Sequence, residues 1–81
     1  MTITVLAFAQ AREALGAGSL RLELPDGSRV GDALGALEAR HPALAGLRPH
    51  LAFAVDQELA RADRPLREGA ELALLPPVSG G

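Results

Sequence analysis

The sequence contains no cysteine, which excludes a disulfide framework, a thiolate metal site and a cysteine nucleophile. Lysine is absent too, so all eight basic side chains are arginine, which a codon bias of the genome explains better than a function. Phe8 and Phe53 are the only aromatic residues, and this makes stacking on nucleobases a poor prospect. The arginines are scattered singly in a chain of net charge −2, so no basic stripe for a phosphate backbone is present and we expect no nucleic-acid partner.

No apolar run approaches the length of a membrane span, and the N-terminus lacks the pattern of a signal peptide. We therefore expect a soluble cytoplasmic protein with no membrane partner. His41 and His50 each stand beside a proline, and they complete no cluster of metal ligands. We expect no bound metal.

What is present suits one small domain. Of the 81 residues 48% are apolar and 22% are charged, and a chain of this length buries roughly 60% of its unfolded surface around one core. We expect a single domain over residues 1–75 and a flexible C-terminal tail over residues 76–81.

Alternating and β-branched residues predict strands, and apolar residues at helical spacing from Val30 predict one main helix that ends near Arg40. We expect strands over residues 2–9, 19–24, 51–55, 58–60 and 70–75, a short helical turn over 10–15, a connection over 43–50, and turns at 25–27, 56–57 and 64–69. A hairpin followed by a helical crossover back to the same sheet predicts an α+β fold of the ubiquitin-like β-grasp type. Its mixed sheet would carry one main helix packed on one face.

The sequence closes on a motif that suits delivery of a chain end. Pro76 and Pro77 fix φ and hold the backbone extended, and Gly80 and Gly81 add no side chain to the tip. The segment Pro76, Pro77, Val78, Ser79, Gly80 and Gly81 can enter a narrow channel of a partner and present its carboxylate in that partner's active site. The alternative is a frayed terminus with no task.

The sequence also resembles the small subunits of molybdopterin synthase, which are sulfur carriers of the ubiquitin-like group. The resemblance lies in residues 5–16 (VLAFAQAREALG), 54–57 (AVDQ), 65–72 (PLREGAEL) and 74–81 (LLPPVSGG). Two positions depart from the pattern, since Asp56 stands where such sequences often have Asn, and Ala70 where they often have Asp. Both departures put local stability in question and leave the tail's chemistry untouched.

This resemblance implies a role for Gly81 as the site of attachment. An adenylyltransferase like the ubiquitin-activating enzymes would join Gly81 to AMP from ATP, and a sulfur donor protein of the cysteine desulfurase or rhodanese type would convert it to a thiocarboxylate. A large subunit would supply the catalytic side chains and use the sulfur to build the dithiolene of molybdopterin. By resemblance we expect a heterotetramer in which this chain binds no cofactor itself.

Strand alternation predicts the surface that meets the partner. Leu75 leads into the tail, so we expect the partner on the sheet face of Leu75, with Phe8, Leu59 and Arg12 at the interface. Arg12 is as well explained as a solvated side chain, and Leu6 fits the core as well as the interface.

Two other functions fit the same residues. One is a sulfur carrier for thiamine or transfer-RNA thiolation, or a ubiquitin-like protein modifier, which shares the chemistry of the two glycines. The Arg12-Glu13 segment argues against the shorter carriers of the thiamine type. The other is a β-grasp interaction module whose tail is idle.

Overall fold

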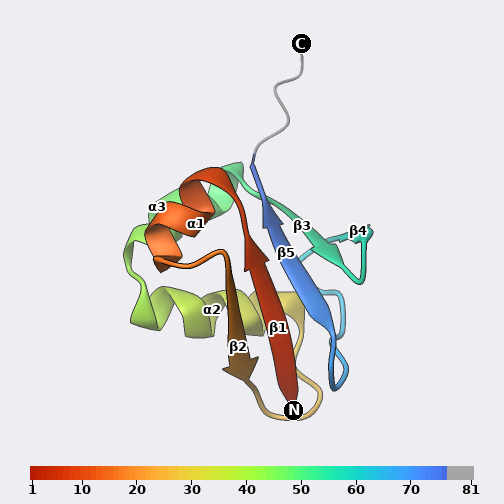
Figure 1. Ribbon diagram of the computed structural model, residues 1–81. Helices are drawn as coiled ribbons and strands as arrows, with labels where there is room; N and C mark the ends of the chain where they lie inside the picture. The colour runs from red at the N-terminus through yellow and green to blue at the C-terminus, as the bar shows by residue number, and fades with distance from the viewer. Residues whose placement is uncertain (77–81) are drawn as a thin grey trace.

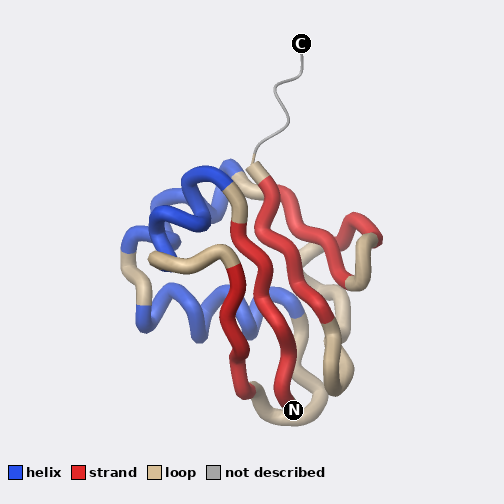
Figure 2. The backbone as a smooth tube through the Cα atoms, in the orientation of Figure 1, coloured by secondary structure: helices blue, strands red, loops and turns tan. Residues whose placement is uncertain are grey.

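The computed structural model describes residues 1–76, which form one sheet with helices beside it (Figures 1 and 2). The elements are β1 Thr2–Ala7, α1 Ala9–Leu15, β2 Ser19–Glu23, α2 Val30–Arg40, α3 Ala43–Leu47, the 3-10 turn η1 Arg48–His50, β3 Ala52–Val55, β4 Glu58–Ala60 and β5 Glu71–Leu75. Within this part of the chain no helix is both long and apolar enough to cross a membrane.

The five strands form one mixed sheet in the order β2-β1-β5-β3-β4. β1 and β5, the first and last strands, are parallel neighbours in its centre, and the other neighbours are antiparallel. The chain forms the β1–β2 hairpin and then crosses over through α2. The later strands β3, β4 and β5 join the same sheet on the side of β1 away from β2. This is the ubiquitin-like β-grasp arrangement that the order of the sequence segments predicted.

One face of the sheet packs on the helices and builds the core. Alternate residues of the central strands point to this face and are at most 3% exposed, namely Ile3, Val5 and Ala7 of β1 and Leu72 and Leu74 of β5. In Figure 1, α2 passes behind β1 and β2, and it contributes Val30, Ala33, Leu34 and Leu37, each 1% exposed or less. Each large aliphatic side chain buried in this way contributes about 1.5–3 kcal/mol. The helical spacing from Val30 is therefore confirmed as the core-facing side of α2.

Glycine inside α2 has a packing reason that the sequence pattern does not reveal. The backbone N–H of Gly31 donates to the carbonyl of Ala62 at 2.8 Å, and a Cβ at Gly31 would lie 3.3 Å from that oxygen. The glycine lets the loop after β4 approach the first turn of the helix. The cost of glycine in a helix, about 1 kcal/mol against alanine, is thus offset by a close contact.

Two parts of the predicted secondary structure were wrong. β1 ends at Ala7, and Ala9 already belongs to α1 with a positive φ of 49°, so the chain turns sharply where the sequence predicted two more strand residues. Residues 43–50, predicted as an irregular connection, form α3 and η1. Pro42 and Pro49 stand at the starts of these two segments, where the missing N–H of proline costs nothing. Leu44 of α3 is fully buried and fixes this segment to the core.

The two-residue hairpin turn was predicted correctly. Asp56 and Gln57 connect β3 to β4, and both have a positive φ, 49° and 70°. This is what a two-residue hairpin loop of type I′ requires. The Asp56 Oδ1 atom accepts the N–H of Glu71 at 3.0 Å, and the Asp56 N–H donates to the Glu71 carbonyl at 2.9 Å. Aspartate at this position therefore ties the hairpin to the start of β5.

Candidate functional site

The end of β5 positions the tail. β5 lies between β1 and β3 and runs parallel to β1, so the chain leaves the sheet at the same end of the strands at which β1 ends (Figure 1). Leu75 is half-buried and Pro76 is exposed at this end. The remaining tail residues of the predicted site, Pro77, Val78, Ser79, Gly80 and Gly81, lie outside the described residues.

The face of the sheet opposite the helices carries a row of apolar residues across four strands. Leu6 of β1 pairs with Ala73 of β5, Ala73 pairs with Ala54 of β3, and Ala54 pairs with Leu59 of β4. Residues in register on neighbouring strands point to the same face, so these four side chains form one stripe. Leu59 is 78% exposed at the end of the stripe.

A second apolar row lies between this stripe and the tail. Leu75 pairs with Ala52, and since Ala7 pairs with Leu74, the next residue along, Phe8, comes beside Leu75. The backbone of Phe8 is still extended, so its side chain continues the alternation on the side of Leu6. Phe8 is 46% exposed, and it and Leu59 are the exposed large apolar residues among residues 1–76.

We call these two rows together the tail-side patch. Its members are Leu6, Phe8, Ala52, Ala54, Leu59, Ala73 and Leu75. Phe8 and Leu59 are exposed, Ala54 is only 8% exposed, and the others are partly buried. Towards the other end of the same face the next row is polar, because Thr4 pairs with Arg21 on one side and with Glu71 on the other. The apolar part of the open face is therefore confined to the half that borders the tail. An exposed apolar area of this kind, rimmed by polar residues, typically marks an interaction site.

The predicted interface residues thus fall into two groups. Phe8, Leu59 and Leu75 come together in the patch, as the alternation predicted, and Leu6 joins them on the open face. Arg12 lies on α1 and is exposed, with its guanidinium beside Gly18, and no ion pair of the described residues involves it. The structure leaves both interpretations of Arg12, a partner contact or a solvated side chain, as they stood.

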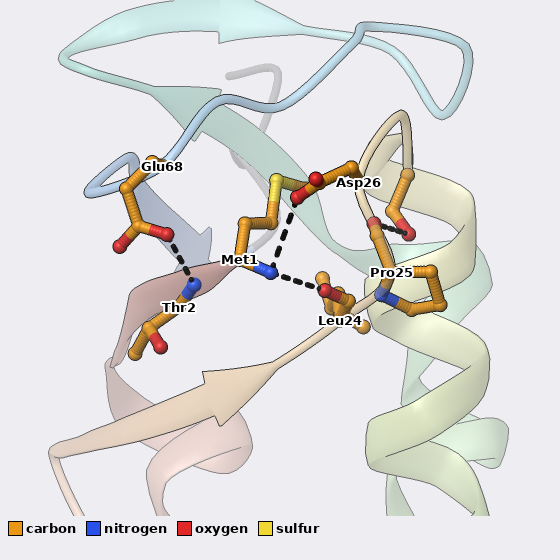
Figure 3. Close-up of polar contacts among 7 residues, drawn as sticks. Met1, Thr2, Leu24, Pro25, Asp26 and Glu68 are labelled. Atoms are coloured by element: carbon orange, nitrogen blue, oxygen red, sulfur yellow. Dashed lines mark hydrogen bonds and ion pairs between the residues drawn. The ribbon is translucent and has the colours of Figure 1, made fainter.

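A polar hollow that the sequence did not predict lies at the other end of the sheet. It encloses about 510 Å³ beside the start of β5 and is lined by Val55, Asp56, Glu58, Arg64, Pro65, Arg67, Glu68, Gly69 and Ala70. Three of its charged groups make contacts within the chain: Arg64 pairs with Glu58 at 3.3 Å, and Glu68 accepts the N–H of Thr2 at 3.0 Å (Figure 3). Within residues 1–76 no group of side chains has the composition of a metal site. The patch and the tail that borders it are therefore the candidate functional site.

Comparison with known proteins identifies relatives over the whole chain. The sequence model of the ThiS family matches residues 5–81 of this chain. The molybdopterin synthase sulfur carrier subunit of Chlamydomonas reinhardtii is 41% identical, with 100% of both chains covered. That of Arabidopsis thaliana is 37% identical over 98% of this chain and 82% of its own length.

A solved structure agrees with the fold. The crystal structure of SAMP1 from Haloferax volcanii superposes with a TM-score of 0.86 at 34% identity and covers 100% of both chains. The match to the family, these identities and the β-grasp topology point the same way. The chain belongs to the ThiS family of ubiquitin-like β-grasp proteins.

Proposed function

We propose that this chain is a sulfur carrier and the small subunit of a molybdopterin synthase in molybdenum cofactor biosynthesis. Its membership of the ThiS family supports the proposal, as does the 41% identity over the full length to a protein named a molybdopterin synthase sulfur carrier subunit. The observation that carries it is the position of the tail-side patch. An apolar docking surface directly borders the point where β5 leads into the Gly-Gly tail.

Gly81 is the reacting residue in this proposal. Its carboxylate attacks the α-phosphate of ATP on an adenylyltransferase, pyrophosphate leaves, and an acyl adenylate remains. The terminal sulfur of a persulfide on a sulfur donor protein of the cysteine desulfurase or rhodanese type then attacks the acyl carbon, and AMP leaves. A thiol cleaves the S–S bond of the resulting acyl disulfide and forms a disulfide with the donor's sulfur, so that Gly81 carries a thiocarboxylate. The chain itself holds no cofactor, because ATP is bound by the activating enzyme.

The patch explains how such a carrier presents its tail. A partner that buries Phe8, Leu59 and Leu75 covers the open half of the sheet and lies against the strand end from which the tail leaves. In the proposed assembly this partner is the large subunit of the synthase, which supplies the catalytic side chains. Two small and two large subunits form a heterotetramer in the cytoplasm. Docking fixes the origin of the tail, and the segment Pro76–Gly81 bridges the distance to the active site.

Removal of Gly81 tests this function. The variant lacking Gly81, and a second variant with residues added after Gly81, should lose sulfur transfer in a reconstituted synthase assay with the large subunit, activating enzyme, ATP and sulfur donor. Because residues 1–75 hold the core, both variants should keep the circular dichroism spectrum and Tm of the parent. A full rate from either variant would contradict the proposal.

A second function is favoured by one comparison. Small archaeal modifier protein 1 of Haloferax volcanii is 38% identical to this chain, over 91% of this chain and 94% of its own length. A protein modifier would use the same activated Gly81 and transfer it to an amine of another protein. Release of a dithiolene product from a pterin precursor supports the first function, whereas covalent conjugates with host proteins and no such product support the second. Carriers for thiamine or transfer-RNA thiolation would give neither.

A further inference from the structure

The junction between β1 and α1 leads the chain from the sheet to the helix layer in very few residues. Ala7, the last residue of β1, is buried on the helix side of the sheet, and Ala11 of α1 is fully buried in the same core. Phe8, Ala9 and Gln10 lie between them, and all three are exposed. A strand that continued with its ordinary negative φ would carry the chain past the core. The junction therefore needs a sharp turn, and Figure 2 shows it at the end of the sheet where β5 also ends.

Ala9 makes this turn with a left-handed backbone. Its φ is 49°, whereas Phe8 before it is extended, with φ −130° and ψ 154°. A residue with a Cβ is strained at positive φ, and alanine lacks the short polar side chain with which asparagine and aspartate bond locally in this region. Ala9 is exposed, so burial of its methyl group in the core does not offset the strain.

Bonds on both sides of Ala9 hold the junction in this geometry. The Phe8 carbonyl accepts the N–H of Ala11 at 3.1 Å and the N–H of Arg12 at 3.4 Å, which fixes the first turn of α1. On the strand side, the Ala7 N–H donates to the Gly18 carbonyl at 2.9 Å. A strained residue persists only where its surroundings over-determine it, and such residues gather at binding and catalytic sites. The strain at Ala9 therefore calls for a functional reason.

The turn places two nearby side chains on opposite faces of the sheet. Phe8 stays on the open face with Leu6, beside Leu75, and is 46% exposed, whereas Ala11 enters the core. The strand end is held in the sheet and the first turn of α1 is held by its bonds. A negative φ at Ala9 would then have to be compensated by rotation at Phe8, which lies between these two fixed parts. Such a rotation would move the aromatic ring off the open face.

We propose that Ala9 is a positioning residue of the docking surface, whose left-handed backbone holds Phe8 in the tail-side patch for the large subunit. The inference rests on the proposed function, which assigns Phe8 to that contact. Ala9 acts through Phe8 and needs no contact of its own with the partner. Residues that accept a positive φ, such as asparagine, preserve the surface at position 9, and β-branched residues, for which this φ is an outlier, disturb it.

A double-mutant cycle tests the coupling between the two residues. Ala9→Val is made in the parent and in a Phe8→Ala background, and the Kd of each chain for the large subunit is measured by isothermal titration calorimetry. Ala9→Asn is the conservative variant. Gln10→Val is the matched control, because it adds the same side chain at the next exposed residue, whose φ is not positive. Circular dichroism spectra and Tm values are recorded for every chain.

The cycle should show that Ala9 acts through Phe8. We expect Ala9→Val to raise the Kd about tenfold in the parent background and less than about twofold in the Phe8→Ala background. Ala9→Asn and Gln10→Val should bind like the parent. An equal loss in both backgrounds, a folded Ala9→Val that binds like the parent, or an Ala9→Asn as weak as Ala9→Val would overturn the proposal. So would a Phe8→Ala variant that binds as tightly as the parent.

Nuclear magnetic resonance of the parent supplies a test that depends neither on the folding of a variant nor on the partner. Scalar couplings of Ala9 should report a positive φ, and the Phe8 ring should show nuclear Overhauser effects to the side chains of Leu6 and Leu75. A negative φ, or ring contacts with Ala11 instead, would overturn the proposal. A parent that gives the expected signals but does not bind the large subunit would instead overturn the proposed function, and with it the docking role of Ala9.

Discussion

Phe8 and Leu59 show at the scale of single residues how far alternation predicts exposure. Phe8 follows a strand whose inward residues are Ile3, Val5 and Ala7, so it falls on the outward side, and the structure leaves it 46% exposed. Leu59 was predicted at the same surface and is 78% exposed. Their exposure and shared face could be predicted because strand alternation is local. Their role in binding depends on a partner and stays a prediction.

Charge introduced into the patch should weaken partner binding. We expect Phe8→Glu to raise the Kd for the large subunit by about thirtyfold, which corresponds to about 2 kcal/mol, because a carboxylate would be buried in an apolar contact. The Tm should shift little, since exposed substitutions change stability by about 0.5 kcal/mol or less. Arg21→Glu, in the polar row of the same face, is the matched control and should leave the Kd near the parent value. Isothermal titration calorimetry and thermal unfolding check both.

Two neighbours on β5 should respond in opposite ways. Leu74 is fully buried against the helices, so Leu74→Ala should lower the free energy of unfolding by about 2–5 kcal/mol through lost packing and a residual cavity. Leu75→Glu points to the patch and should mainly weaken binding. Urea unfolding of both variants, with binding measured beside it, separates the two roles. A larger stability loss for Leu75→Glu than for Leu74→Ala would place Leu75 in the core.

At the scale of elements, local signals predicted what local physics controls. The spacing from Val30 predicted α2, and Asp56-Gln57 predicted the hairpin turn, because both depend on nearby residues. The helical segments α3 and η1 were missed, since Pro42, Gly46 and Pro49 suggested an irregular connection. What makes this stretch helical is tertiary packing of Leu44, which no local pattern reports. The end of β1 at Ala7 was missed because the chain turns at Ala9 with a positive φ of 49°, which the alternation of residues 2–9 does not indicate.

The β3–β4 turn stores backbone strain that a glycine should relieve. Gln57 has a φ of 70°, a region that costs a residue with a Cβ about 1–2 kcal/mol. We expect Gln57→Gly to raise the free energy of unfolding by about 0.5–1 kcal/mol, after its larger loss of chain entropy, and the Tm by about 4 °C. Gly69→Ala is the converse control, because Gly69 has a φ of 79° and open space around it, so its Tm should fall. A lower Tm for Gln57→Gly would show that the turn is not strained.

At the scale of the whole molecule, the topology joins the parts of the candidate site. The patch combines residues from distant parts of the sequence, namely Leu6, Phe8, Leu59 and Leu75. They share one face of the sheet because β5 inserts between β1 and β3. The order of elements predicted the fold class. β5 ends at Leu75, and the division into a domain over residues 1–75 and a tail over residues 76–81 stays a prediction. The exact pairing of the strands could not be predicted from the sequence pattern. This pairing places Ala54 and Ala73 in one row and also forms the polar hollow at the far end.

The central claim is that Gly81 carries sulfur, and the intact mass of the chain tests it most directly. The protein is incubated with ATP, its activating enzyme and a sulfur donor, and the modified residue is located by fragmentation. We predict a mass increase equal to the replacement of one oxygen by one sulfur, located at Gly81. An unchanged mass, with an activating enzyme shown to be competent on another carrier, would contradict the account and leave a β-grasp binding module with an apolar docking face.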